Sequence, residues 1–298
     1  MNPLPPDRFQ NFAAIDWSGA AGERHHGIAL ALCEGGDAAP KLVRPGHRWS
    51  RSEILDWLLH DLPPDTLVGF DMSFSFACAD AGAYFPGWAN SPHSARELWA
   101  LAEQVSAEEL HLGATKFADH AEIAPHFRRH GGREGAAFGA NGQKGGRGRF
   151  RQTEHAQARA GCRPYSNFNL VGAAQVGKGS LAGMRLLHRL QHRYAIWPFD
   201  PLPDSGSVLV EIYTTLAAIA AGRTAGRSKI RDYNDLNAAL AVLGSKPVPG
   251  TGAITDHAAD ALISAAWLRT LAHDPANWAP PLLDPAIAAT EGWTFGAA

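Results

Sequence analysis

The sequence predicts an α/β fold in which a mixed sheet is flanked by helices. Short apolar runs typical of strands, an amphipathic helix between them and further helix-spaced segments near the end of the chain lead to this prediction. Two of these runs, AAIDWSG at 13–19 and LVGFDMS at 67–73, predict buried strands, and each contains one aspartate at its end. A carboxylate at the mouth of a buried strand is costly unless its charge is compensated.

The segment between these two runs predicts two more strands and a helix. Residues 26–32 predict a second strand, and a weaker third strand is expected around 42–43. Ser50 and Glu53 have the spacing of a capping box, which predicts a helix that ends before the prolines at 63–64. A strand meander followed by a helix and a returning strand is typical of an α/β arrangement.

The two aspartates are expected to lie close together. A right-handed crossover would place the strand of Asp71 beside the first strand and parallel to it. Because neighbouring strands are about 4.8 Å apart, side chains at their ends can share one ligand. Asp16 and Asp71 therefore predict a cation site.

The remainder of the chain alternates helical segments with one strand. A strand is expected at 208–213, and helices are expected at 94–104, 180–190, 228–243 and 256–271. Residues 131–148 hold eight glycines and predict a flexible loop. No internal repeat or clear linker is present, so we expect one domain over 1–298, with a glycine-rich basic insertion at about 85–165 after the fourth strand.

Composition excludes several classes of protein. The chain has 298 residues, 45% hydrophobic and 19% charged, with a net charge of −2, which is typical of a soluble globular protein. Cys33, Cys78 and Cys162 are widely spaced, which favours neither a disulfide framework nor a zinc site and fits a reducing cytoplasm. No apolar run approaches the length of a membrane span, and a signal peptide is not predicted.

Four acids interrupt or end apolar elements, namely Asp16, Asp71, Glu211 and Asp260. His257 and Asp260 are three positions apart and so share a helix face, as do Asp256 and Asp260 at four. Carboxylate oxygens suit Mg²⁺ or Mn²⁺. Two such ions about 4 Å apart can activate water and stabilise the leaving oxygen in phosphodiester hydrolysis. A histidine beside them can orient or deprotonate that water.

Each of these residues also has a structural interpretation. Asp16 and Asp71 can cap turns, and Asp256 can cap or charge the first turn of its helix. Glu211 can pair with a buried arginine, and His257 can be a surface or core histidine. The conjunction favours a site, because four independent structural acids at such costly positions would be unusual.

The chain also resembles a known family. The motifs AAIDWSG, LVGFDMSF, VLVEIYTT, DHAADALISAAWL and EGWTFG, in that order, are similar to those of the uncharacterised family of predicted RNase H-like nucleases, domain of unknown function 429. The final helix is similar to that of RuvC-type Holliday-junction resolvases, in which a His or Asp precedes an Asp by three positions, as His257 precedes Asp260. Thr214 stands where the family usually has a proline.

The resemblance implies an RNase H-like fold. It implies a five-stranded mixed sheet with acids on the first and fourth strands and on the last helix, and Asp16, Asp71 and Asp260 match those positions. Its nuclease label rests on the fold, so the resemblance bears more directly on fold than on function.

A basic segment follows the middle of the chain. Between 128 and 151 it carries one acid, Glu134, and seven basic residues: Arg128, Arg129, Arg133, Lys144, Arg147, Arg149 and Arg151. Such a segment can bind a nucleic-acid backbone, and Phe127, Phe138 and Phe150 could stack on bases. A solvated disordered loop is the alternative interpretation.

Residues 172–180 nearly match a phosphate-binding P-loop. Gly179 occupies the position of the hydroxyl that would bind Mg²⁺, so an NTPase site is not supported. Lys178 and the amides at a helix start can still hold a phosphate. The alternative is a glycine-rich turn packed on the sheet.

The sequence thus predicts a cytoplasmic, metal-dependent nuclease of RNase H-like fold that uses a two-metal mechanism. Asp16, Asp71 and Asp260 would bind Mg²⁺ or Mn²⁺, Glu211 would complete the site, and His257 would assist water activation. Lys178 and the basic segment would bind DNA or RNA, and a homodimer would suit resolvase-like chemistry. An ATP-dependent phosphotransferase and a non-catalytic nucleic-acid-binding module remain alternatives.

Overall fold

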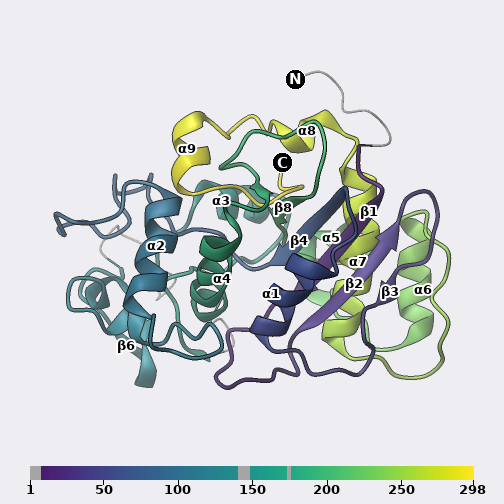
Figure 1. Ribbon diagram of the computed structural model, residues 1–298, viewed down its shortest axis with the longest axis horizontal. Helices are drawn as coiled ribbons and strands as arrows, with labels where there is room; N and C mark the ends of the chain where they lie inside the picture. Colours follow the sequence, from purple (N-terminus) through teal and green to yellow (C-terminus); the bar gives the residue numbers. More distant parts are fainter. Residues whose placement is uncertain (1–7, 140–147, 173–175) are drawn as a thin grey trace.

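A six-stranded mixed sheet forms the centre of the protein, as the computed structural model shows for residues 8–139, 148–172 and 176–298 (Figure 1). The strands are β1 (Asn11–Asp16), β2 (Ala29–Glu34), β3 (Lys41–Leu42), β4 (Thr66–Asp71), β7 (Ala195–Ile196) and β8 (Val208–Glu211). They are arranged in the order β3-β2-β1-β4-β8-β7. β2 is antiparallel to β1 and β3, whereas β1, β4, β8 and β7 run parallel. A separate two-stranded pair joins β5 (Arg128–Arg129) to β6 (Arg133–Glu134).

The predicted α/β class is confirmed, with one more strand than the five expected. The additional strand β7 is only two residues long, too short to produce a periodic pattern in the sequence. It pairs with the outer side of β8 and forms one edge of the sheet.

Nine α-helices occur in the described residues: α1 (Arg51–His60), α2 (Ala95–Val105), α3 (Gln152–Arg159), α4 (Val176–Leu190), α5 (Thr214–Ala220), α6 (Tyr233–Val242), α7 (Asp256–Leu271), α8 (Pro275–Trp278) and α9 (Pro285–Thr290). Short 3₁₀ turns lie at Lys116–Asp119, Ala124–His126, His130–Gly132 and Ala225–Arg227. The predicted capping box of α1 is present, because Ser50 and Glu53 exchange hydrogen bonds with each other's amides. α4 begins at Val176, so Ser180 lies inside it rather than capping it.

The helices cover both faces of the sheet. Because successive side chains of a strand point to opposite faces, each strand residue can be assigned to one of them. Ala13 and Ile15 of β1 pack in a cluster with α1, α2 and α4, whereas Phe12 and Ala14 pack in a cluster with α5, α6 and α7. Figure 1 shows α1 and α4 in front of the sheet and α7 behind it. Asp16 is two residues after Ala14, so its side chain lies on the same face, the one covered by α7.

The region predicted as an insertion lies between β4 and β7 and contains α2, α3 and several 3₁₀ turns. Most of the predicted loop at 131–148 falls in 140–147, outside the described residues. None of the helices in the described part of the chain combines the length and the apolar character that a membrane span requires.

Candidate functional site

Asp16 and Asp71 end neighbouring parallel strands and occupy the same register, Asp16 of β1 opposite Asp71 of β4. α7 packs across this end of the sheet and presents His257 and Asp260. His257 Nδ1 lies 2.7 Å from Asp16 Oδ2, and Asp16 is only 7% exposed. The structure thus places Asp16 beside Asp71 and in contact with His257, and α7 also carries Asp260.

The three aspartates destabilise one another's charged forms. Burial and the charges of Asp16 and Asp260 raise the pKa of Asp71 to about 8. Burial and the charge of Asp16 raise the pKa of Asp260 to about 7. Burial also raises the pKa of Asp16, although the hydrogen bond from His257 opposes this. The site therefore carries more negative charge than its surroundings compensate.

Two basic side chains partly offset this negative charge. The hydrogen bond to Asp16 raises the pKa of His257 above its ordinary value. Lys229 Nζ lies 3.0 Å from Asp256 Oδ2. Although burial opposes it, the contact with Asp256 and the charges of Asp260 and Asp16 raise the pKa of Lys229. Asp256 follows the N-cap residue Thr255, which agrees with its structural interpretation as a first-turn charge.

The first residue of α5 fixes the position of Asp71. Thr214 donates its backbone N–H to Asp71 Oδ1 over 3.3 Å and its hydroxyl to Asp71 Oδ2 over 3.0 Å. A proline at this position would lack both donors. Thr214 therefore orients the Asp71 carboxylate.

The donor set fits a hard divalent cation in its chemistry, since it consists of carboxylate oxygens with an excess of negative charge. Among the described residues, however, no group of three or more His, Cys, Asp or Glu side chains converges closely enough to hold a metal ion. The Mg²⁺ or Mn²⁺ cofactor expected at Asp16, Asp71 and Asp260 consequently stays a prediction.

A pocket of 410 Å³ opens at this end of the sheet. Asp71 and His257 contribute to one side of its lining, and loop residues Ser18 and Gly19 to another. Its further lining includes Glu154, Gln157, Tyr165, Asn167 and Glu211. Asp71 and His257 thus border a space that a ligand can enter.

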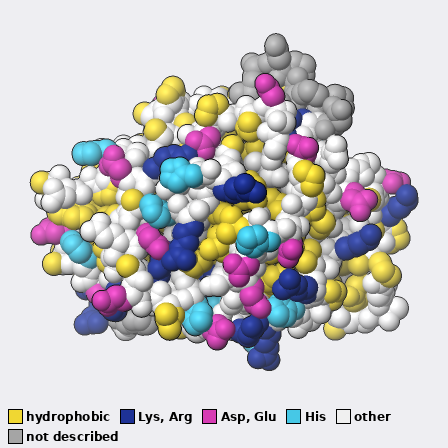
Figure 2. Space-filling view, viewed as in Figure 1, with side chains coloured by type: hydrophobic (Ala, Val, Ile, Leu, Met, Phe, Trp, Pro, Cys, Tyr) yellow, Lys and Arg dark blue, Asp and Glu magenta, His cyan; other side chains and the backbone are white. Residues whose placement is uncertain are grey.

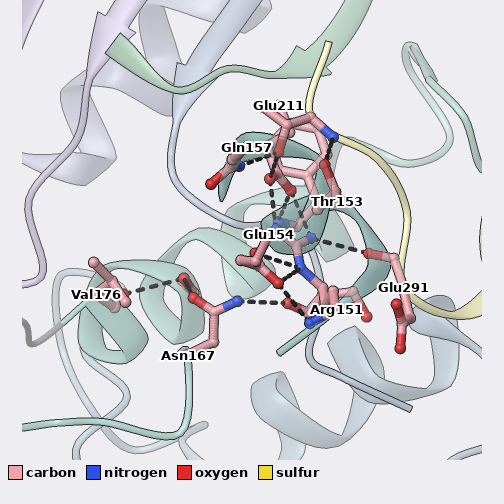
Figure 3. Close-up of polar contacts among 12 residues, drawn as sticks. Arg151, Thr153, Glu154, Gln157, Asn167, Val176, Glu211 and Glu291 are labelled. Atoms are coloured by element: carbon pink, nitrogen blue, oxygen red, sulfur yellow. Dashed lines mark hydrogen bonds and ion pairs between the residues drawn. The ribbon is translucent and has the colours of Figure 1, made fainter. Parts of the chain in front are cut away.

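Glu211 does not join the aspartates. Its side chain points to the same face of the sheet as Leu209, which packs on the α4 side. Asp16 and Asp71 point to the opposite face, on the α7 side. Its carboxylate accepts hydrogen bonds from both terminal nitrogens of Arg151, at 2.6 and 2.8 Å (Figure 3). Phe74 N–H and the Thr294 hydroxyl also donate to Glu211. The structure therefore favours its interpretation as the partner of a buried arginine over the catalytic one.

Arg149 and Arg151 cannot bind nucleic acid as expected, because both side chains are buried. Arg151 is 0% exposed and pairs with Glu154 and Glu211, and Arg149 pairs with Asp80. Phe127 and Phe138 are also buried and so cannot stack on bases. These four side chains therefore contribute to the core rather than to a nucleic-acid-binding surface.

The other basic residues have mixed outcomes. Arg128 and Arg129 are partly exposed. Arg128 Nε lies 3.7 Å from Glu134 Oε1, and Arg129 Nη1 lies 3.3 Å from Asp119 Oδ1. Lys144 and Arg147 lie outside the described residues. On the face in Figure 2, acidic and basic side chains are interspersed rather than gathered in one basic patch. Lys178 is partly exposed in the first turn of α4 and lines a pocket next to the acidic one.

Two residues of the site were missed by the sequence analysis. Lys229 belongs to no motif and reaches the aspartates from the segment between α5 and α6, so no local signal could have indicated it. Thr214 had a signal, because a hydroxyl residue at the start of a helix beside a strand-end aspartate is a plausible hydrogen-bond donor.

The fold and site define a mixed α/β protein with an acidic pocket at the carboxyl ends of parallel strands. Comparison of the chain with models of known protein families, with curated proteins and with solved structures found no match.

Proposed function

We propose that the protein is a metal-dependent nuclease of RNase H-like fold that hydrolyses phosphodiester bonds in nucleic acid. The observation that carries the proposal is the pairing of Asp16 with Asp71 in register, beside Asp260 of α7, at a pocket. The strand order β3-β2-β1-β4-β8, with β2 antiparallel, supports the fold, as do acids on β1, β4 and the last long helix.

Each residue has a distinct role in this proposal. Asp16, Asp71 and Asp260 would hold Mg²⁺ or Mn²⁺, which when bound polarises the phosphate and lowers the pKa of water. Thr214 keeps the Asp71 carboxylate oriented. His257 is held at Nδ1 by Asp16, so its Nε2 is the nitrogen left to take a proton from the attacking water.

The proposal is tested with labelled single-stranded, duplex and branched DNA and RNA, each incubated with Mg²⁺, Mn²⁺ or EDTA. We expect cleavage only with metal. Asp16→Asn and Asp260→Asn should each lower the rate at least about a hundredfold, because an amide is a poor substitute for an anionic metal ligand. Asp61→Asn is the matched control, since Asp61 is an exposed acid at the end of α1 that pairs with Arg44 at 3.6 Å.

Three outcomes would contradict the nuclease proposal. Cleavage that persists in both aspartate variants would remove the site from the chemistry. ATP binding without cleavage of any nucleic acid would favour the phosphotransferase. Nucleic-acid binding that is insensitive to EDTA, without cleavage under any condition, would favour the non-catalytic binding module.

A further inference from the structure

A second pocket adjoins the acidic one and carries the opposite charge. It has a volume of 260 Å³ and is bounded by residues 19–22, residues 109–115 and the start of α4. Gly19 and Ala20 line both pockets, so only this turn separates them. The chemistry proposed for the aspartates does not use this second pocket.

Arg51, in the wall of this second pocket, is a buried charge without a carboxylate partner. It is 2% exposed and donates to three main-chain carbonyls, those of Ser18, Ala20 and His111. No ion pair to it occurs in the described part of the chain. Burial and the charge of Arg185 lower the pKa of Arg51 to about 10, against the opposing charge of Glu109, so it stays protonated at neutral pH. Arg51 therefore places a buried positive charge in the wall of this pocket, held there by main-chain carbonyl oxygens.

Lys178 supplies a second positive charge in the same pocket. It is partly exposed, and within the described residues no hydrogen bond or ion pair engages it. Glu109 also lines the pocket, but its carboxylate already accepts hydrogen bonds from the amide and hydroxyl of Thr115 and from the amide of Lys116, at 2.6 to 2.9 Å. Two cations therefore face the pocket, and its one carboxylate already has partners.

We propose that this second pocket binds a phosphate group of a nucleic-acid backbone that lies across the acidic pocket. Lys178 makes the direct contact, and Arg51 adds positive potential from the wall. The inference rests on the proposed function, which places another phosphate of the same strand at the aspartates. One strand can occupy both pockets at once, because its phosphates recur along a single chain and the two pockets share the turn at Gly19 and Ala20. Such contacts position the strand without reading its sequence.

The test measures binding of 12-nucleotide single-stranded DNA and RNA by fluorescence anisotropy in EDTA over a salt series. Lys178→Ala should weaken binding about fivefold, the factor that corresponds to roughly 1 kcal/mol. It should also reduce the slope of log affinity against log salt by about 0.7, the value for one phosphate contact on a single strand. Lys178→Glu should weaken binding further. Lys246→Ala is the matched control, since Lys246 is exposed and lies 2.9 Å from Asp37.

Affinity and salt slope that are unchanged in Lys178→Ala would overturn the inference. A separate calorimetric arm uses inorganic phosphate and pyrophosphate, because these share the chemistry of the backbone. Lys178-dependent binding of these ions without oligonucleotide binding would overturn the assignment to a nucleic-acid backbone.

The same measurements separate this inference from the nuclease proposal. If the wild type cleaves nucleic acid through its aspartates but Lys178→Ala binds normally, only the phosphate subsite is wrong. If no metal supports cleavage but Lys178→Ala still weakens oligonucleotide binding, only the nuclease proposal is wrong.

Discussion

Asp71 shows how an isolated residue acquires unusual chemistry from its position. Its charge is disfavoured by burial and by two neighbouring aspartates, and Thr214 supplies the only side-chain hydrogen bond recorded for it in the described residues. The folded protein therefore binds a proton at Asp71 up to a pH of about 8, whereas an unfolded chain releases it near the ordinary value of 3.8.

This difference sets the direction of the pH dependence of stability. Because the folded-state pKa is raised, the stabilisation is fully present below the unfolded pKa and is lost as the pH rises through about 8. In EDTA, we expect the Tm of the wild type to fall between pH 5 and pH 8.5. Asp71→Asn removes the repulsion and should raise the Tm at pH 8 by about 2–4 °C, the shift that roughly 1 kcal/mol gives a chain of this size. Differential scanning calorimetry measures both effects.

The exposed acid Asp61 provides the control for this experiment. Asp61→Asn should retain the pH dependence of the wild type, since Asp61 follows α1, pairs with Arg44 and is 55% exposed at its side chain. Two results would show that the three carboxylates do not repel one another. One is a wild-type Tm that stays constant across this pH range, and the other is an unchanged Tm in Asp71→Asn.

The positions of Asp16 and Asp71 at strand ends and of His257 and Asp260 on one helix could be predicted because each depends on a local pattern. A strand-end position and a three-residue helical spacing can both be read directly from the chain. Glu211 also ends a strand, but its face depends on how β8 pairs with β4, where Phe70 lies opposite it. That register is a tertiary property, and it directs the Glu211 side chain to Arg151.

At the scale of elements, the acidic pocket depends on how closely α4 approaches the loop that follows β1. Trp17 Nε1 donates to the Gly179 carbonyl over 3.0 Å. A Cβ at Gly19 would lie 2.2 Å from Gly179 N, which is backbone that cannot rotate away. Gly19 therefore lets the first turn of α4 lie against this loop. Gly177, within the near P-loop, has a packing role elsewhere, because a Cβ there would lie 2.0 Å from the Asn167 carbonyl oxygen. The alternative interpretation of the segment, a glycine-rich turn packed against the sheet, stays a prediction, because residues 173–175 lie outside the described part and 176–180 belong to α4.

The two glycines at this contact should respond differently to a methyl group. Gly19→Ala should lower the free energy of unfolding by about 1–3 kcal/mol, the usual cost of overpacking. Gly179→Ala should be tolerated or stabilising by up to about 1 kcal/mol, because its Cβ would meet nothing closer than 3.6 Å and alanine favours a helix. Urea unfolding measures both free energies.

Gly35→Ala is the control for Gly19→Ala, since a Cβ there would lie 3.7 Å from its nearest neighbour. Equal stabilities of the Gly19 and Gly35 variants would mean that α4 and the β1 loop separate at little cost. The contact would then not define the wall between the two pockets.

At the scale of the whole molecule, the end of the chain joins segments that are far apart in sequence. The Glu291 carboxylate accepts hydrogen bonds from the backbone N–H groups of Cys78 and Ala79, which follow β4, and of Gln152 in α3. Phe295 N–H donates to the carbonyl of Glu211. The EGWTFG motif thus fastens the insertion to β8. The sequence could indicate that this motif matters through resemblance, but Gln152 and Cys78 are separated from Glu291 by 139 and 213 residues, and such distant partners leave no periodic signal.

Arg151 lies at the centre of this junction and provides its most direct test. Arg151 donates to Glu154, to Glu211 and to the carbonyl of Glu291 (Figure 3). Arg151→Met would leave two buried carboxylates without a counter-charge, so it should lower the free energy of unfolding by about 3–5 kcal/mol.

Arg189→Met is the comparison for this prediction, because Arg189 also pairs with a carboxylate, Glu103 at 2.7 Å, but is 43% exposed at its side chain. An exposed pair of this kind contributes about 0–1 kcal/mol. Arg151→Lys keeps the charge but loses the planar fork that reaches two carboxylates, so it should fall between these variants and remain measurable if Arg151→Met does not fold. Urea unfolding followed by tryptophan fluorescence gives the three values. If Arg151→Met and Arg189→Met were equally stable, the buried ion network would not hold the insertion and the C-terminal segment to the sheet, and another set of contacts would have to shape the far wall of the acidic pocket.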